Sequence, residues 1–173
     1  MLAATQEAIA VKNNFTVRPV TMADVEAAVD LFNSCSRSQL GVDELELNEV
    51  KIEWQTPDFS LNNSTRAVFS AEGKLVGYVE VWDLKQPPVH PWVWGRVHPD
   101  FEDLGIGTFM MAWAGERARR AIARVPQGAR VAMRSGSLST HEPSKRLLQD
   151  LDMQLIRHFW DMKIEMEQAP PAP

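Results

Sequence analysis

The sequence predicts a mixed α/β fold built on a largely antiparallel sheet. Two apolar runs, Leu75 to Trp82 and Trp92 to Val97, have the length and residue types of strands, and the proline-rich segment between them is typical of a long hairpin tip. The stretch from Val97 to Thr108 then passes through Gly-x-Gly into a long amphipathic pattern, which indicates a strand, a tight loop and a helix. Together with the flanking helical patterns, these runs predict one twisted sheet of about six or seven strands with about four helices.

The first elements alternate between strand and helix. A strand is expected from Phe15 to Pro19, and Thr21 or Asp24 can cap the helix that follows. That helix has an apolar stripe from Val25 to Phe32 and is expected to break at Ser34 to Ser38.

Two further elements precede the hairpin. A second helix is expected from Glu44 to Trp54, with its apolar residues facing inward. A short strand is expected from Thr65 to Ser70, and the chain turns at Glu72-Gly73.

The hairpin places its side chains on alternating faces. Tyr78, Glu80 and Trp82 share one face, and we expect Trp92, Trp94, Arg96 and His98 to share another. Tryptophan is frequent for a chain of this length, and Trp82, Trp92 and Trp94 gather at the hairpin, where core packing is the simplest role and an apolar or aromatic amine site is the alternative.

A long helix is expected from Gly107 to about Arg124. The residues expected to face the sheet are Met111, Gly115, Ala118 and Ile122, and beside them Met110, Ala114 and Ala121. Glu116, Arg120 and Arg124 are expected to lie outside at i, i+4 spacing. A solvated helix face explains the outer arginines, and contact with a ligand phosphate is the alternative.

Three elements are expected after this helix. A fifth strand covers Val131 to Ser135, a short helix covers Pro143 to Leu151, and one or two closing strands cover Gln154 to Glu167. The domain is therefore expected to span residues 15–167, between an N-terminal extension at 1–14 and a proline-rich tail at 168–173.

Composition narrows the function classes. The 173 residues are enough for one domain with a core, and the formal net charge of -5 argues against nucleic-acid binding and mildly favours a cationic amine substrate. Cys35 is the only cysteine, so we expect no disulfide and a reducing cytoplasm. No apolar run is long enough to span a membrane, and the histidines lack metal-ligand spacing, so we expect neither a membrane nor a metal partner. The sequence is compatible with a homodimer.

The Gly-x-Gly loop is expected to bind an anion. Gly105 and Gly107 let the backbone approach a ligand closely, and the helix that follows leaves its first N–H groups unpaired, with its positive dipole end at the loop. A dinucleotide-binding motif would have a third glycine and a P-loop would have Gly-Lys-Ser/Thr, and neither pattern is present.

Motifs along most of the chain resemble the GNAT superfamily of acyl-CoA-dependent N-acyltransferases. The motifs that carry the resemblance are Val17-Arg18-Pro19-Val20-Thr21-x-x-Asp24, Gly73-Lys74-Leu75-Val76-Gly77-Tyr78, the Val97-His98-Pro99 strand end, Leu104-Gly105-Ile106-Gly107-Thr108, Leu147 to Met153, and Leu155 to Met166. The resemblance implies transfer of an acetyl group from acetyl-CoA to a primary amine of a small molecule or protein by direct attack.

The resemblance also implies a cofactor site. The fourth and fifth strands would splay, and the pantetheine arm of CoA would pair with the edge from Trp94 to Val97. The pyrophosphate would lie on the N–H groups of Leu104, Gly105, Ile106, Gly107 and Thr108, and an N–H near Val97 would polarise the thioester carbonyl.

Several side chains differ from the family pattern. Glu102, followed by Asp103, stands where the family has Arg or Gln, and two carboxylates oppose a pyrophosphate unless they point into solvent. Leu148 stands where many members of the family have the tyrosine that protonates the leaving thiolate. Met133 stands where some members have an acidic residue in the fifth strand.

Glu80 and His141 are the candidate catalytic residues. Glu80 could accept a proton from an ammonium, and an ion pair with Arg96 or an exposed edge position is the alternative. His141 could give a proton to the leaving thiolate, and a helix cap is the alternative. The differences from the family leave a second function open, namely a catalytically weak or inactive GNAT-fold domain with a structural or ligand-sensing role, derived from a two-domain protein.

Overall fold

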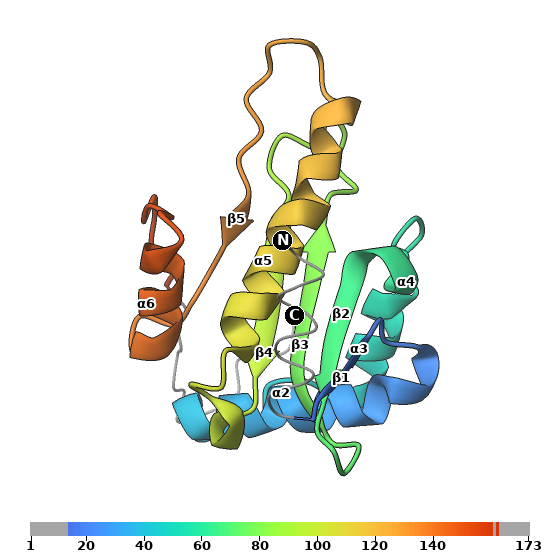
Figure 1. Cartoon of the computed structure of the whole chain (residues 1–173), viewed down its shortest axis with the longest axis vertical. Coiled ribbons are helices and arrows are strands. Elements are labelled where there is room, and N and C mark those ends of the chain that lie inside the picture. The colour runs from blue at the N-terminus through green and yellow to red at the C-terminus, as the bar shows by residue number, and fades with distance from the viewer. Residues whose placement is uncertain (1–13, 161, 163–173) are drawn as a thin grey trace, which may run out of the picture.

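The computed structural model describes residues 14–160 and 162, which form three layers (Figure 1). A five-stranded sheet lies between helix α5 (Ile106–Arg119) on one face and helices α2 (Val25–Leu40) and α3 (Leu47–Trp54) on the other. Helix α6 (Glu142–Asp150) stands beside the last strand (Figure 1). The predicted α/β class is confirmed.

The sheet follows chain order from its first strand to its fifth. The strands are β1 (Thr16–Arg18), β2 (Thr65–Phe69), β3 (Leu75–Trp82), β4 (Trp92–Val97) and β5 (Arg134–Ser135). The first four pair antiparallel, and β5 runs parallel to β4. The sheet is largely antiparallel as predicted, but its strands within the described residues are fewer than the six or seven expected.

The two hairpin strands β3 and β4 place their aromatic side chains on one common face. Their register sets Tyr78 opposite Arg96 and Trp82 opposite Trp92. Directly opposed residues of an antiparallel pair project to the same side. The expectation that the two sets of hairpin residues lie on separate faces is therefore wrong, and both sets face α2 and α3.

Helix α2 continues through the serine-rich segment at which a break is expected. The hydroxyl of Ser34 donates to the carbonyl of Asp30 at 2.7 Å, and the hydroxyl of Ser36 donates to that of Phe32 at 2.8 Å. Serine can interrupt a helix by bonding to its own backbone, but these bonds to carbonyls four residues earlier fit inside the helix. The helix ends instead at Gly41, whose φ of 78° is left-handed.

The helix starts follow the predicted capping chemistry. Thr21 caps the short 3-10 turn η1 (Met22–Asp24) in a capping box, and Asp24 precedes α2. Hydrogen bonds from Arg18 are the main cause of the low Asp24 pKa, about 2. Helix α3 begins at Leu47, later than expected, and the short helix α4 (Leu61–Ser64) then leads into β2.

Helix α5 packs on the sheet through most of the residues expected to face it. Met111 and Ala118 are buried, but Ile122 is 57% exposed. The α-helix ends at Arg119 and tightens into a 3-10 turn, η3 (Arg120–Arg124), which rotates the following side chains away from the helical stripe.

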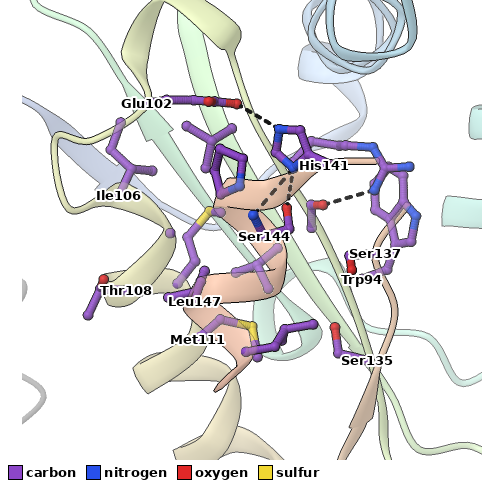
Figure 2. A pocket seen from close by; sticks show the side chains of 18 of the residues that line it. Trp94, Glu102, Ile106, Thr108, Met111, Ser135, Ser137, His141, Ser144 and Leu147 are labelled. Atoms are coloured by element: carbon purple, nitrogen blue, oxygen red, sulfur yellow. Dashed lines mark hydrogen bonds and ion pairs between the residues drawn. The ribbon is translucent and has the colours of Figure 1, made fainter. Parts of the chain in front are cut away.

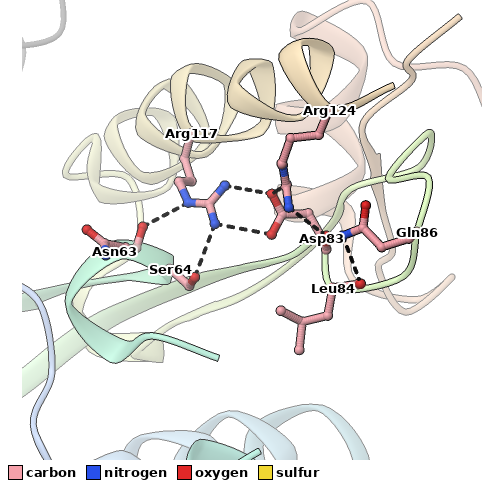
Figure 3. Close-up of polar contacts among 7 residues, drawn as sticks. All are labelled: Asn63, Ser64, Asp83, Leu84, Gln86, Arg117 and Arg124. Carbon is pink, nitrogen blue, oxygen red and sulfur yellow. Dashed lines mark hydrogen bonds and ion pairs between the residues drawn. The ribbon is translucent and has the colours of Figure 1, made fainter. Parts of the chain in front are cut away.

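A buried ion-pair group ties the end of α5 to the sheet (Figure 3). Asp83, which follows β3, accepts hydrogen bonds from Arg117 at 2.8 and 3.1 Å and from Arg124. Arg117 also donates to the backbone carbonyl of Asn63 and to the hydroxyl of Ser64 at the end of α4. Arg124 therefore holds Asp83 instead of lying on a solvated face.

The C-terminal part differs most from expectation. The fifth strand is two residues long, and residues 154–160 form no strand although closing strands were expected there. Because β5 pairs so briefly, it offers little edge to which a further strand could bond. Residues 161 and 163–167 of the expected span lie outside the described residues. Helix α6 agrees with its prediction to within a residue at each end.

Within the described residues, no helix combines the length and apolar composition needed to cross a bilayer.

Candidate active site

Strands β4 and β5 separate shortly after they meet. They pair at Trp92 with Arg134 and at Val93 with Ser135, and β5 then diverges (Figure 1). The remainder of β4, from Trp94 to Val97, has no strand partner on this side within the described residues. The predicted splay of the fourth and fifth strands is confirmed.

The open edge of β4 presents backbone groups to the gap. On the other edge of the strand, the N–H of His98 donates to the carbonyl of Val76 at 2.9 Å. Backbone groups alternate sides along a strand, so Gly95 and Val97 direct their N–H groups toward the gap. An extended ligand could add to this edge as a further strand does.

Helix α5 begins beside the same gap without a side-chain cap. Gly105 precedes it with a left-handed φ of 81°, and the N–H of Phe109 is bonded to the Gly105 carbonyl at 3.0 Å. The N–H groups of Ile106, Gly107 and Thr108 lie before this first helical bond and are available to an anion. A Cβ on Gly107 would lie 3.0 Å from the side chain of Leu147 on α6, so glycine keeps this approach open.

The first cavity, about 350 Å³, lies between β4, β5, the start of α5 and α6 (Figure 2). Its walls include five of the residues predicted to bind the cofactor, namely Val97, Gly105, Ile106, Gly107 and Thr108. Leu104, the sixth, does not line this cavity, and its side chain is 41% exposed. His141 also lines the cavity, whereas Glu80 does not.

A hydrogen-bonded chain of three side chains crosses one end of this cavity. Figure 2 shows Glu102 and His141 pointing toward each other, with Nε2 of His141 3.2 Å from Oε1 of Glu102. Nδ1 of His141 lies 2.6 Å from Oγ of Ser144 and accepts the Ser144 backbone N–H at 3.4 Å. His141 therefore caps α6, as its alternative role requires, while its other nitrogen joins the two loops around the cavity.

Two of the positions that differ from the family pattern, Leu148 and Met133, have apolar surroundings. Leu148 lines the first cavity, and both Leu148 and Met133 pack against the core under α5. Tyr78 is fully buried, lines neither cavity and donates its hydroxyl to Glu80 at 2.6 Å. None of the three offers a proton donor to the first cavity.

Cys35 lies behind the open edge. Its thiol donates to the Val97 carbonyl at 3.1 Å and is buried, which raises its pKa to about 11. The thiol is therefore protonated at neutral pH and supports the strand instead of serving as a nucleophile.

A second cavity, about 340 Å³, lies on the α3 side of the hairpin. Leu45, Glu53, Glu80, Trp82, Trp92 and Trp94 line it. Trp92 and Trp94 also line the first cavity, so the two cavities adjoin at these two residues.

Glu80 is the buried carboxyl of the second cavity. It is 4% exposed, accepts the Tyr78 hydroxyl, and accepts the indole N–H of Trp82 at 2.7 Å. Burial is the main cause that raises its pKa to about 7, and the Glu53 carboxylate adds to the effect while the two hydrogen bonds oppose it. Neither alternative for Glu80 fits, because no ion pair joins it to Arg96 among the described residues, and it is not exposed.

Some of these relations could be anticipated from the sequence, and others could not. The alternation in β3 places Glu80 beside Tyr78 and Trp82. In contrast, Glu53 reaches the cavity from another helix, and Glu102 meets His141 across 39 residues of chain. No local pattern signals either contact.

Comparisons with known proteins agree with this geometry. Residues 25–131 match the family model described as the acetyltransferase (GNAT) family. No curated protein sequence gives a significant match.

Solved structures share the fold. A GCN5-related N-acetyltransferase from Sphaerobacter thermophilus is 23% identical with a TM-score of 0.73, and the match covers 80% of this chain but 43% of that one. The protein YncA from Salmonella typhimurium, solved with its cofactor acetyl-CoA, is 19% identical with a TM-score of 0.61, and the match covers 80% of this chain and 79% of that one. An N-acetyltransferase from Staphylococcus aureus Mu50 is 16% identical with a TM-score of 0.60, covering 80% and 82% of the two chains.

Proposed function

This chain belongs to the acetyltransferase (GNAT) family, and from that premise we propose that it transfers an acetyl group from acetyl-CoA to a primary amine by direct attack. The observation that carries the proposal is the open edge of β4 beside the uncapped start of α5. An extended amide arm and a pyrophosphate are the two chemical groups that these backbone features suit. Acetyl-CoA contains both and supplies an activated thioester.

Backbone groups bind and orient the acetyl donor. The N–H groups of Ile106, Gly107 and Thr108 hold the pyrophosphate, and the edge from Gly95 to Val97 pairs with the pantetheine arm. The Gly95 N–H points into the same gap nearer to Trp94, where it stabilises negative charge on the thioester oxygen, while the Val97 N–H pairs with the arm closer to the pyrophosphate. The sulfur-bearing end of the arm is thereby directed toward the wall formed by Trp92 and Trp94.

Two side chains handle protons in this proposal. Glu80 accepts a proton from the ammonium in the adjoining second cavity, since a carboxyl with a pKa of about 7 is well suited to take a proton at neutral pH. The amine nitrogen then forms the amide bond as the C–S bond breaks, and it releases its second surplus proton to solvent. His141, whose Nε2 faces the Glu102 carboxylate, returns a proton to the thiolate.

The proposal is tested by following thiol release from acetyl-CoA over a panel of amines, with the acetylated product identified by mass. Calorimetry separately measures acetyl-CoA binding. Gly107→Val fills the space between the N–H donors and Leu147, and we expect it to abolish binding. Gly115→Ala is the matched control on the same helix, because its new methyl group would meet only the end of Arg119 at 3.8 Å.

The two readouts separate the candidate functions. Failure of acetyl-CoA to bind the native protein contradicts the proposal. Binding without turnover on any amine favours the catalytically inactive domain.

A further inference from the structure

The second cavity combines aromatic walls with negative charge. Three of its lining side chains are indoles, one is aliphatic and two are carboxyls, and the lining contains no basic residue from the described part of the chain. Indole faces attract cations, and apolar surface favours an apolar ligand body. A hydrophobic ammonium compound matches both properties.

The aromatic walls are held rigidly. Trp82 stacks on Phe59 with ring centroids 4.0 Å apart and an interplanar angle of 10°. Trp94 meets Phe32 edge-on at 4.8 Å, and the guanidinium of Arg96 lies 4.3 Å from the Trp94 ring. These contacts fix the shape of the cavity before a ligand enters, which reduces the entropy lost on binding.

The two carboxyls lie at different depths. Glu80 is buried, with each of its oxygens already bonded to one donor, whereas Glu53 is exposed on α3. A carboxylate oxygen has lone pairs for more than one donor, so Glu80 can still accept a hydrogen bond from a ligand N–H. Glu53 adds negative potential at the solvent side, which attracts a cation without fixing its position.

The cavity also lies in the right place for an acyl acceptor. It shares the side chains of Trp92 and Trp94 with the cavity of the open β4 edge. A ligand amine at this shared border lies next to the first cavity, where it can approach a group bound there.

We infer that the second cavity is the acceptor site and that it selects a primary amine with one ammonium group on a flat apolar body, of which 2-phenylethylamine is a simple representative. The inference rests on the proposed function for the identity of the bound amine as acceptor. The ammonium lies at Glu80, and the ring lies among the indoles. A short alkylamine lacks the ring, and a polyamine places additional charge against the apolar walls.

The inference predicts a ligand preference that calorimetry can measure without turnover. We expect 2-phenylethylamine to bind both the free protein and the protein saturated with CoA at least about tenfold more tightly than ethylamine, putrescine or neutral 2-phenylethanol. A tenfold preference for 2-phenylethylamine, in the free protein or in the protein saturated with CoA, supports the inference. Absence of binding in both states, or equal binding of ethylamine, overturns it.

Two variants test the two halves of the recognition. Glu53→Gln should weaken 2-phenylethylamine about threefold and leave 2-phenylethanol unchanged, because it removes only charge from an exposed position. Trp92→Leu should weaken both compounds, because it removes indole surface from a half-exposed side chain. Glu26→Gln, on the exposed side of α2 outside the cavity, is the matched control for loss of one negative charge. Insensitivity to both Glu53→Gln and Trp92→Leu contradicts the site.

Turnover distinguishes this inference from the proposed function. If the enzyme acetylates other amines but not 2-phenylethylamine, the acceptor class is wrong and the acetyltransferase proposal remains. If 2-phenylethylamine binds with the expected dependence on Glu53 and Trp92 but no amine is acetylated, the amine site remains and the proposed function fails.

Discussion

Glu80 is the side chain whose chemistry depends most on its surroundings. The period of two along β3 predicts its neighbours Tyr78 and Trp82, but it does not predict that both donate hydrogen bonds to one carboxyl. The burial that raises its pKa comes from packing against α2 and α3, and Glu53 arrives from α3. Residue-level chemistry was therefore predicted where it depends on local alternation and missed where it depends on tertiary packing.

The stability of the protein should depend on pH through Glu80. Its pKa is raised from 4.5 to about 7 in the folded state, so folding favours the protonated form. That stabilisation is present below pH 4.5 and is lost as pH rises through about 7. Glu80→Gln has no titrating group at this position. As pH rises from about 5 to about 8, wild type should therefore lose about 2 kcal/mol in free energy of unfolding relative to Glu80→Gln.

Urea unfolding of both proteins across this pH range measures the difference. The groups that face Glu80 are the Tyr78 hydroxyl, the Trp82 indole and the Glu53 carboxylate. Glu53→Gln removes the neighbouring charge that raises the Glu80 pKa, so it should reduce the pH-dependent loss of wild type. A constant difference between wild type and Glu80→Gln at all pH values would show that Glu80 titrates normally.

Glu102 offers a second test at the residue scale. The sequence predicts a carboxylate next to the anion-binding loop, and the structure adds its contact with His141 on the opposite side of the cavity. Glu102→Arg removes a negative charge beside the expected pyrophosphate and adds a positive one, so acetyl-CoA should bind about 1 kcal/mol more tightly at this partly exposed site. Calorimetry measures the affinity, and Asp30→Arg on the exposed side of α2 is the control for the change of charge. Equal affinities of Glu102→Arg and wild type for acetyl-CoA would show that the Glu102 carboxylate does not interact with the pyrophosphate.

At the scale of elements, the prediction is best where the pattern is local and strongest. The bounds of β3 and β4 agree with the two apolar runs, since prolines and polar residues mark their ends. The prediction failed at α2 because a run of serines was taken to end a helix, whereas their hydroxyls bond to the preceding turn. It failed at β5 because a strand in a splayed pair has little hydrogen bonding to extend it.

The ion pairs around Asp83 make a prediction about how α5 is held. Arg117 is 11% exposed and Asp83 is 2% exposed, and Arg117 connects α5 to both β3 and α4. Asp83→Ala leaves the buried Arg117 charge without its carboxylate, so we expect a loss of about 3 kcal/mol in the free energy of unfolding. Glu116→Ala removes the partner of Arg119 on the same helix, but that pair is exposed and the loss should stay below about 1 kcal/mol. Similar losses in the two variants, measured by urea unfolding, would contradict a special role for the buried pair.

At the scale of the whole molecule, the two cavities have different origins. The divergence of β5 opens the first, and the hairpin aromatic residues opposite α3 form the second. Resemblance of motifs was enough to predict the split and the loop beside it. It could not predict that two cavities would adjoin at two tryptophans, because that arrangement depends on the register of β4 against β3 and on the rings packed behind them.

Two adjoining cavities favour direct transfer over an acyl-enzyme. In the proposed reaction both substrates are bound at once, and the only cysteine is buried with a pKa of about 11. Ser144 is the strongest remaining candidate for an acyl carrier, because its hydroxyl lies 2.6 Å from Nδ1 of His141. However, the same Nδ1 accepts the Ser144 backbone N–H at the start of α6, so this contact also serves as a helix cap.

We therefore expect sequential kinetics and no stable acetylated form of the protein. Double-reciprocal plots at several amine concentrations should intersect, because both substrates must be bound before either product leaves, whereas an acyl-enzyme gives parallel lines. Intact mass measurement after incubation with acetyl-CoA alone should show no added acetyl group. Cys35→Ala and Ser144→Ala separate the two nucleophiles, and neither should convert the kinetic pattern, although Ser144→Ala should lower the turnover number by freeing Nδ1 of His141. Parallel lines, together with a protein-bound acetyl group that is absent from Ser144→Ala, would show instead that Ser144 carries the acyl group. The direct attack proposed beside Trp92 and Trp94 would then be wrong.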